Sequence, residues 1–395
     1  MKSNIIAISG TPVSGKSTTV DGLIDKLQER GFDRDKIHVF NVGQEFRKYF
    51  NAVFSIMANF DDKDKVAEIF EEYPEMKKMS GSILQAIGNT RNKGIDANAI
   101  TIAEANDMPE LTEIRAEIDN FIDTRTKQLG KEIIERNDDS EFWIFDSRLA
   151  FNFIPESLAV RLTCRDDIAA KRLMADSTRG KEDSGYDTIE EGKEQLTKRK
   201  MSERRRYQDI YDIDLFDESN YDLIIDTSFA KTEDIVDTIL MCQERFKNDQ
   251  HFSQKWASPK QFLGRQNVRQ TALGLEKYIE NMRREGINPD YPIDAIEVDG
   301  VLIQFDGHHR TVSAAQIGKT LVPYQLNPEK YKGRTFTNEE DVLYGLNISR
   351  LYDHEDLLGF GTYDEVYPGL IAKIAEKQEE KRLSKQKDIE DDEGR

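Results

Sequence analysis

The chain has few of the residues on which several classes of protein depend. Its 395 residues include only two cysteines, Cys164 and Cys242, and five histidines. Two cysteines so far apart argue against a disulfide framework or a zinc site. No apolar run approaches the roughly 20 residues of a membrane helix, and the opening residues, MKSNIIAISG, lack a signal-peptide pattern. We therefore expect a protein of a reducing cytoplasm with no membrane partner.

Basic charge is also scarce. The sequence has 56 lysines and arginines against 75 acidic residues, which gives a net charge of −19. Such a charge opposes non-specific attraction to DNA, RNA or anionic membranes. A nucleic acid partner is not expected, although a local basic cluster can still bind a phosphate. The sequence does not indicate an oligomeric state.

The pattern of apolar residues predicts two domains and a tail. Residues 1–247 alternate strands and helices, which is typical of an α/β fold with a mostly parallel sheet. Between residues 51 and 115 the spacing is helical, so we interpret this segment as a helical insertion. The pattern breaks near 249–259, where we expect a linker. The strands expected in this first domain are Ile5–Ser9, Ile37–Phe40, Phe142–Phe145, Val160–Thr163 and Leu223–Ile225.

A smaller α+β domain is expected over residues 258–372. Helices are predicted at Gly274–Arg284 and Arg310–Ile317. The expected strands of this domain are Ile296–Val298, Val301–Phe305 and Val322–Leu326. The tail 373–395 is so rich in charge that it predicts a solvated helix or disorder, and no function is assigned to it.

The densest motif is GTPVSGKST, which matches G-x-x-x-x-G-K-[ST] from Gly10 to Ser17. It follows a short apolar strand and precedes a helical stretch, which is the context that a P-loop requires. In such a loop, backbone amides surround an anion, Lys16 reaches the β- and γ-phosphates of ATP, and the Ser17 hydroxyl binds Mg²⁺. The residues expected to bind the cofactor here are Gly10, Ser14, Gly15, Lys16, Ser17 and Thr18.

Arginines recur along the rest of this domain, as phosphoryl transfer requires, because that reaction is catalysed by positioning and charge neutralisation. Taken singly, each arginine fits a solvated surface equally well. As an ordered series on a P-loop scaffold, they favour a function. The series is Arg47, Arg148, Arg172, Arg179, Arg199 and Arg206.

Over roughly residues 3–245 the chain resembles the cytidylate kinase family, especially its compact archaeal-type members. The GxxFR segment of that family is matched by Gly43, Phe46 and Arg47, which implies that Arg47 holds the acceptor monophosphate. Arg148, after a strand, is implied as a second ligand of the acceptor. Asp146 stands where related kinases place an acidic residue near the Mg²⁺ waters.

The family's R-x-x-x-D-x-x-R segment is matched by Arg199, Glu203 and Arg206, with glutamate in place of aspartate. The resemblance implies that these residues contact phosphates and the sugar. Arg172 and Arg179 fall where the family has a mobile lid over ATP. Asp119 and Asp123 match the family loosely and fit surface carboxylates equally well. The residues implied in catalysis are Lys16, Arg148, Arg172 and Arg179.

Two departures from the family stand out. Val13 occupies a position of the loop that is usually small, beside Pro12. The insertion 51–115 falls in the region that recognises the acceptor. The resemblance therefore defines the donor side better than the acceptor.

A second motif, DGHHR, lies in the smaller domain, where Gly307, His308, His309 and Arg310 open a predicted helix. A helix N-terminus with an arginine fork favours phosphate binding. Adjacent histidines do not share a helix face, so a His–His metal pair is not expected. For His308 the alternative is an exposed turn residue, and for His309 ligand and turn residue are equally good.

The stretch around this motif resembles the ParB/sulfiredoxin superfamily over about residues 258–330. Its G-x-x-R turn is matched by Gly307 and Arg310, and its later G…VP by Gly318 with Val322-Pro323. The resemblance implies nucleotide phosphate binding at the turn. The DGHHR form is closer to the small-molecule kinases of the superfamily, and sulfinic acid reduction is not expected because His308 replaces the cysteine that it needs.

Three hypotheses follow. In the first, the chain is an ATP- and Mg²⁺-dependent kinase of nucleoside monophosphates, CMP or dCMP first. In the second, it phosphorylates the hydroxyl of a small metabolite such as an amino acid, with one or both sites. In the third, it is a non-catalytic nucleotide sensor, although a sensor has less need of the arginine series.

Overall fold

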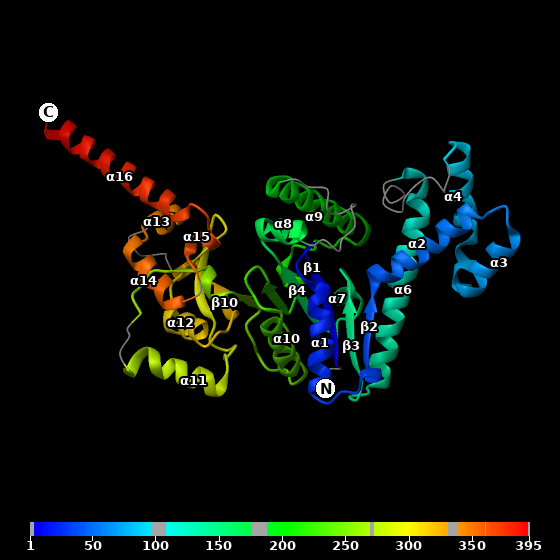
Figure 1. Ribbon diagram of the computed structural model, residues 1–395, viewed down its shortest axis with the longest axis horizontal. Coiled ribbons are helices and arrows are strands. Elements are labelled where there is room, and N and C mark those ends of the chain that lie inside the picture. Colours follow the sequence, from blue (N-terminus) through cyan, green and yellow to red (C-terminus); the bar gives the residue numbers. More distant parts are fainter. Residues whose placement is uncertain are drawn as a thin grey trace. The chain divides into compact units, whose positions relative to one another are not determined.

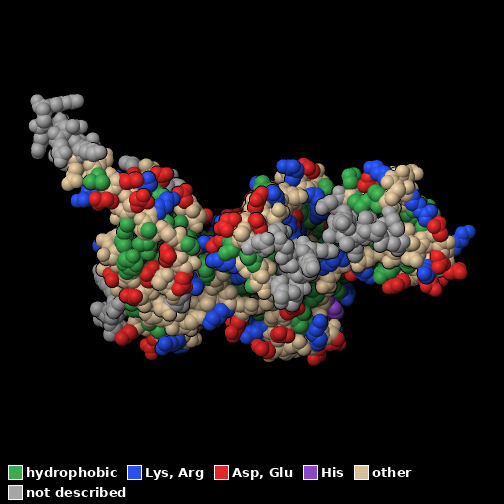
Figure 2. Space-filling model, turned by 45° about the horizontal axis from the view of Figure 1, so that its top comes forward, with side chains coloured by type: hydrophobic (Ala, Val, Ile, Leu, Met, Phe, Trp, Pro, Cys, Tyr) green, Lys and Arg blue, Asp and Glu red, His purple; other side chains and the backbone are tan. Residues whose placement is uncertain are grey.

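The computed structural model describes residues 4–95, 108–175, 188–268, 272–330, 338–359 and 361–393. The chain forms two compact units, each built from segments that are distant in the sequence. The first contains residues up to Gly10, Ile24–Ala159 and Ala170–Asn220, and the second contains Thr11–Leu23, Val160–Ala169 and Tyr221 onward. None of the described helices is long and apolar enough to cross a membrane. On the face shown in Figure 2, acidic and basic side chains are interspersed.

A three-stranded parallel sheet forms the centre of the first unit. Strand β3 (Phe142–Asp146) pairs with β1 (Ile5–Gly10) on one side and with β2 (Ile37–Asn41) on the other (Figure 1). Every residue of β1 is buried, as expected for a continuous apolar run in a parallel sheet. The three strands predicted in this region are confirmed, with their ends moved by one residue.

Helices make up the rest of the first unit, and the described parts of the insertion 51–115 are helical, as its spacing predicts. The long α6 is capped by Asn137, which takes a left-handed conformation with φ 46°. The helices are α2 (Val42–Ala58), α3 (Lys63–Glu72), α4 (Ser80–Asn92), α6 (Thr112–Arg136), α7 (Ala150–Phe153) and α9 (Ile189–Tyr211), with 3₁₀ turns at Pro74–Met79 and Pro109–Leu111.

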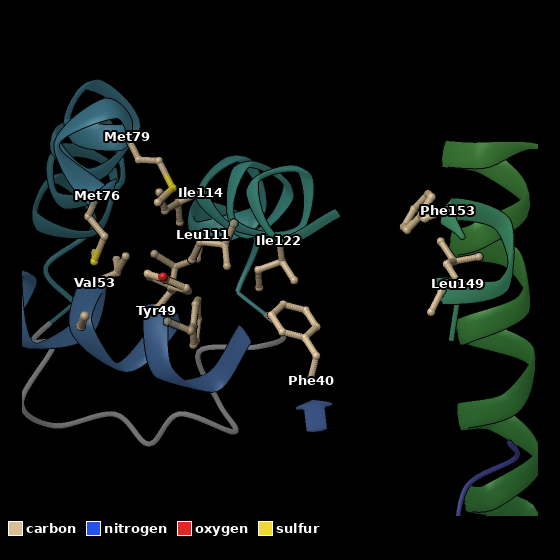
Figure 3. Close-up of a cluster of buried hydrophobic side chains, with 14 of the residues drawn as sticks. Phe40, Tyr49, Val53, Met76, Met79, Leu111, Ile114, Ile122, Leu149 and Phe153 are labelled. Carbon is tan, nitrogen blue, oxygen red and sulfur yellow. The ribbon is translucent and has the colours of Figure 1, made fainter. Parts of the chain in front are cut away.

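The helices of the insertion share one apolar core with α2 and α6. Figure 3 shows Tyr49 and Val53 of α2 pointing toward Met76, Leu111 and Ile114. These five side chains are completely buried. The described helices of the insertion are therefore part of the core of the first unit.

Strands of the second unit follow the order β4-β5-β6-β10-β8-β9-β7. Most neighbours run parallel, while the pairs β6–β10 and β8–β9 are antiparallel. The strands are β4 (Leu158–Thr163), β5 (Leu223–Asp226), β6 (Lys255–Ala257), β7 (Phe262–Gly264), β8 (Ile293–Val298), β9 (Val301–Gln304) and β10 (Val322–Leu326).

The expected linker at 249–259 is wrong in one respect, because it contains β6. This strand pairs with β5 through Ile224 and Ile225 and with β10 through its other edge. Trp256 at its centre is 2% exposed. A strand of three residues is too short to show an alternating pattern, so no pattern of apolar residues predicts it. The sheet thus runs without interruption from β5 into the smaller predicted domain.

Helices surround the strands of the second unit. A π-helical turn at Ala272–Glu276 precedes α11, where a single helix was expected. The tail continues as α16 through the last described residues. The helices are α1 (Lys16–Glu29) and α8 (Asp166–Ala175), which the two units share, and α10 (Thr232–Lys247), α11 (Lys277–Glu285), α12 (His308–Gln316), α13 (Glu339–Tyr344), α14 (Ile348–Leu358), α15 (Tyr363–Val366) and α16 (Leu370–Glu393).

Asp234 of α10 joins this helix to the loop between α12 and β10. Its carboxylate accepts hydrogen bonds from the Thr320 amide at 2.8 Å, the Thr320 hydroxyl at 2.6 Å and Lys319 Nζ at 2.9 Å. These bonds lower the pKa of Asp234 although burial alone would raise it. The helix that follows β5 is therefore fixed to the smaller predicted domain.

Close packing of α6 on α7 gives a test of the first unit. A Cβ on Gly130 would lie 2.6 Å from Cγ1 of the buried Ile154, whereas one on Gly88 of α4 would meet no described atom within 4 Å. We expect Gly130→Ala to lower the free energy of unfolding by about 1–2 kcal/mol, because overpacking outweighs the better helix propensity of alanine. Gly88→Ala should raise it by about 0.5–1 kcal/mol. Chemical denaturation measures both, and a stabilising Gly130→Ala would contradict the packing.

Candidate functional site

The glycine loop has the backbone geometry that its sequence predicts. Strand β1 ends at Gly10 and α1 begins at Lys16. The Thr11 amide donates to the Leu162 carbonyl at 3.0 Å, and the Ser14 amide donates to the Thr11 carbonyl at 3.2 Å. Gly15 has φ +82°, and a Cβ there would meet no atom of the described residues within 4 Å. The loop is therefore tightly turned, and the described part of the chain leaves space next to Gly15.

Two hydroxyls of this loop fit an anionic ligand. Thr11 Oγ1 and Ser14 Oγ are buried, and each lacks a hydrogen-bond partner among the described residues. Leaving a buried hydroxyl unpaired costs free energy, so a ligand with acceptor oxygens fits this loop. The first turn of α1 contains no acidic residue, and Ser17 and Thr18 are exposed there. The positive end of the helix dipole and the backbone amides of the loop together favour the binding of phosphate. These features define a P-loop of the nucleotide-binding class.

Val13 is strained. Its φ is 61°, a left-handed conformation that a β-branched side chain disfavours. The residue that the sequence marks as a departure from the family is thus also the position at which the backbone turns. Thr227, after β5, has its hydroxyl 3.0 Å from the Ser14 carbonyl and 2.9 Å from the Thr163 carbonyl, and it donates to both. This shared hydrogen bond ties the strained turn to residues outside the loop.

On the acceptor side, three predicted residues meet in the first unit. Arg148 follows β3, and its Nη2 lies 2.9 Å from Oε2 of Glu203 on α9. Arg199, one turn earlier on α9, lies 3.5 Å from the same carboxylate. Arg148 and Glu203 are half-buried. Glu203 therefore contacts one arginine that follows β3 and another on its own helix. The spacing of residues on α9 predicts only the second of these contacts.

Arg206, the third predicted residue of α9, faces α6. Its Nη1 lies 3.9 Å from Asp119 Oδ2, and Tyr211 donates its hydroxyl to Asp123. Burial raises the pKa of Asp119 to about 6 and also raises the pKa of Asp123. The two aspartates are thus not ordinary surface carboxylates, an alternative that the sequence left open.

Asn41 joins the ends of β2 and β3. Its Oδ1 accepts from the Gln44 amide at 2.8 Å and so caps α2, while its Nδ2 donates to Asp146 Oδ2 at 2.8 Å. Arg47, exposed on the same helix, has Nη1 3.7 Å from the position of a Cβ on Gly43. Gly43, Arg47 and Asp146 therefore lie around one helix start. The capping pattern of an asparagine after a strand was the signal that the sequence reading missed.

Only part of the predicted lid lies within the described residues. Arg172 lies on α8. Arg179, together with Gly180 and Gly185, lies outside the described residues.

The Gly307 turn in the second unit is built as expected. Gly307 caps α12 with φ +88°, and a Cβ there would lie 2.9 Å from Arg310 Nη2 and 3.1 Å from Ile293. Arg310 donates from Nη2 to the Pro292 carbonyl at 3.2 Å. Its Nε is buried without a hydrogen-bond partner among the described residues. Only glycine fits this turn, and the arginine keeps one donor for a ligand.

The two histidines of the turn differ. His309 stacks on Tyr278 with 5.3 Å between ring centroids, and its Nε2 is buried with no hydrogen-bond partner in the described structure. His308 is 6% exposed and accepts from the Arg265 amide at 3.2 Å. Burial lowers the pKa of His308 to about 4. The alternative of an exposed turn residue is therefore wrong for His308, which is buried and neutral near pH 7.

A second buried histidine lies nearby. His354 on α14 is 2% exposed, and its Nδ1 lies 2.5 Å from the Tyr363 hydroxyl. Tyr363 donates to the Phe262 carbonyl at 2.6 Å, so Nδ1 of His354 must carry the proton that it shares with Tyr363. Burial lowers the pKa of His354 to about 3.

Comparison with known proteins places this site in a family. The cytidylate kinase-like family matches residues 5–229, which is more than half of the chain. The chain belongs to this family. The match contains the glycine loop and the clusters of Arg148 and Arg206, and it ends before the Gly307 turn.

The relatives of this chain include proteins named cytidylate kinase and one named a nucleotide dehydratase. A cytidylate kinase of Methanosphaera stadtmanae is 33% identical over 125 residues, which are 32% of this chain and 68% of the relative. One from Methanobrevibacter smithii is 29% identical over 161 residues, 41% of this chain and 79% of the relative. An S-adenosylmethionine-dependent nucleotide dehydratase of Lacinutrix mariniflava is 29% identical over 156 residues, 39% of this chain but only 29% of that protein.

The strain at Val13 can be measured. Val13→Gly removes about 1–3 kcal/mol of left-handed strain but adds about 0.5–1 kcal/mol of unfolded-state entropy. We expect a net gain of about 1 kcal/mol in the free energy of unfolding, measured by chemical denaturation. Val13→Ile, which keeps the branched Cβ, should give no gain. A loss of stability in Val13→Gly would contradict the strain.

His354 gives a test that depends on pH. A histidine whose pKa falls on folding stabilises the native state above its unfolded pKa, and this contribution is lost as the pH falls toward the folded value. We therefore expect the stability advantage of wild type over His354→Phe to shrink by about 2 kcal/mol between about pH 6.5 and about pH 5. Urea denaturation at several pH values measures the difference. A difference that does not change with pH would show that His354 is not buried in its neutral form.

Proposed function

We propose that the chain is an ATP-dependent kinase of nucleoside monophosphates, with CMP or dCMP as the first acceptor to test. The observation that carries this proposal is the glycine loop: two buried hydroxyls have no hydrogen-bond partner among the described residues, at the acid-free start of α1. Membership of the cytidylate kinase-like family supports a kinase. Relatives named cytidylate kinase support the choice of acceptor.

In this proposal the loop and α1 hold the triphosphate of ATP. Lys16 neutralises the β- and γ-phosphates, and the exposed Ser17 hydroxyl is a ligand for Mg²⁺. The metal supplies charge neutralisation on the phosphates when it is bound. Asp146, buried and held by Asn41, is suited to orient waters of the metal. Arg172 and Arg179 would cover the donor, as the family resemblance implies.

The acceptor monophosphate would bind to Arg47 and Arg148. Glu203 lies 2.9 Å from Arg148 and 3.5 Å from Arg199, so both guanidinium groups are oriented before the substrate arrives. Such pre-organisation is what phosphoryl transfer requires, because the protein contributes mainly position and charge. Arg206 with Asp119 would extend the site toward the nucleoside.

The Gly307 turn is proposed as a second phosphate site, in a domain of the ParB/sulfiredoxin type. Arg310 Nε and His309 Nε2 are both buried without partners among the described residues, and α12 begins there. A nucleotide or a phosphorylated metabolite fits this arrangement. This observation also keeps the second candidate, a kinase of a small metabolite hydroxyl.

Phosphoryl transfer can be tested with an acceptor panel. We expect ADP release from ATP with CMP or dCMP, and a loss of at least about 100-fold in kcat/KM for Lys16→Ala. Lys26→Ala is the matched control, because Lys26 lies on the same helix paired with Glu29 at 3.2 Å. No turnover with any nucleoside monophosphate would sink the proposed acceptor class. Turnover that survives in Lys16→Ala would sink the role of the loop.

The two sites can be separated by their own variants. Arg148→Ala should raise the KM for the monophosphate by at least about tenfold, because a charged hydrogen-bond donor to the phosphate is lost. Arg310→Ala should leave that KM unchanged. A metabolite screen followed by phosphorus NMR of the products is the parallel arm. If a metabolite is phosphorylated and Arg310→Ala abolishes that product, the second candidate function is correct.

A further inference from the structure

One side chain from outside the glycine loop restrains it. Thr227 is 1% exposed, and its hydroxyl shares its one proton between two carbonyls, that of Ser14 at 3.0 Å and that of Thr163 at 2.9 Å. The Thr227 amide donates to the Thr163 carbonyl at 2.9 Å, which fixes the backbone at the end of β5. Ser14 directly follows the strained Val13. A strained backbone persists only where its surroundings hold it, so the loop depends on where Thr227 lies.

Asp226, the residue before Thr227, is bound by a side chain from the C-terminal half of the chain. Asp226 accepts from the Ser228 amide at 2.8 Å through Oδ1 and from Gln261 Nε2 at 2.8 Å through Oδ2. Gln261 is 3% exposed, its Oε1 accepts from the Ser258 amide at 2.9 Å, and its carbonyl accepts from the Tyr367 hydroxyl at 2.8 Å. The Gln261 amide group is therefore paired on both sides and buried, which makes it a rigid support.

Arg165 adds a second tie at the same place. Its amide donates to the Ser228 hydroxyl at 2.9 Å. Its guanidinium lies 5.0 Å from the ring centroid of Tyr367 and 5.6 Å from that of Phe229, within the range of a cation–π contact. The same tyrosine thus contacts Arg165 after β4 and Gln261, so the ends of β4 and β5 are both fixed by residues of the C-terminal half.

We propose that Gln261 is a positioning residue for the nucleotide-binding loop. It fixes Asp226, Asp226 fixes the end of β5, and Thr227 then presents its hydroxyl to Ser14 so that the loop keeps the shape that binds ATP. Gln261 lies beyond residue 229, where the match to the cytidylate kinase-like family ends. The kinase segment of this chain therefore relies on a support that the smaller domain supplies. The inference rests on the proposed binding of ATP.

The test measures ATP affinity directly, by calorimetry on the full chain. Gln261→Leu and Thr227→Val should each weaken ATP binding by about tenfold, because each removes one buried hydrogen bond of the support. The double variant should bind no more weakly than Thr227→Val alone, because both residues act through one path. Thr227→Ser, which keeps the hydroxyl, should bind like wild type. In turnover, the KM for ATP should rise while the KM for the acceptor stays the same.

Gln304→Leu is the matched control. Gln304 is a fully buried glutamine of the same half, and its amide donates to Thr311 Oγ1 at 2.7 Å and to the Asp306 carbonyl at 3.2 Å instead of to β5. It should lower stability while leaving the KM for ATP in turnover of the nucleoside monophosphate unchanged, because its hydrogen bonds lie at the Gly307 turn and not at the glycine loop. Wild-type affinity in Gln261→Leu, an equal rise of that KM in Gln304→Leu, or additive losses in the double variant would each overturn the positioning role. Failure of wild type to bind ATP would instead remove the proposed function.

A second variant covers the case in which Gln261→Leu does not fold. Gln261→Glu has the same shape but places a carboxylate against Asp226. Two close carboxylates hold one proton between them at lower pH, and that proton restores a hydrogen bond. The loss of ATP affinity relative to wild type should therefore shrink between about pH 8 and about pH 6. A loss that is constant with pH would overturn the role of the Gln261–Asp226 bond.

Discussion

The hydroxyl of Thr227, placed between the carbonyls of Thr163 and Ser14, ties the turn of the glycine loop to the ends of β4 and β5. A phosphate-binding loop must point its amides at the ligand, and in this chain the loop turns at a valine with φ 61°. The strained residue lies within the loop, but Thr227, whose hydroxyl contacts the loop, lies outside it. The loop is therefore only as well ordered as the end of β5, and β5 is held on its far side by β6 and by Gln261.

The residues proposed to bind the acceptor are held by ion pairs and not by backbone strain. There the charges are arranged around carboxylates: Glu203 contacts two arginines and Asp119 contacts Arg206. Burial raises the pKa of Asp119 to about 6, so its charge is sensitive to whatever binds nearby. The insertion contributes to the core beneath this region through Met76 and Leu111. The insertion thus supplies part of the core that supports the residues proposed to bind the acceptor.

Sequence reasoning found the features that local pattern dictates. The strands of buried apolar runs, the glycine loop before α1 and the Gly307 turn before α12 were all predictable, because each depends on residues close together in the chain. What failed depends on distant partners. A strand of three residues, such as β6, is too short to show a periodic pattern of apolar residues. The burial of His308 results from packing against residues that are distant in the sequence. No motif marks Gln261, because its proposed role depends on its contact with Asp226. The predicted domain boundaries and the roles of the site residues stay predictions.

The position of β6 also affects how this protein can be divided. A cut at residue 247, where the alternating pattern ends, would remove the strand that pairs with β5. The backbone groups of β5 on that side would then face solvent beside Ile224 and Ile225, which are now buried. Exposed apolar edge strands recruit other chains. A fragment that ends at residue 247 would therefore be prone to aggregate, because the two predicted domains share the edge of one strand.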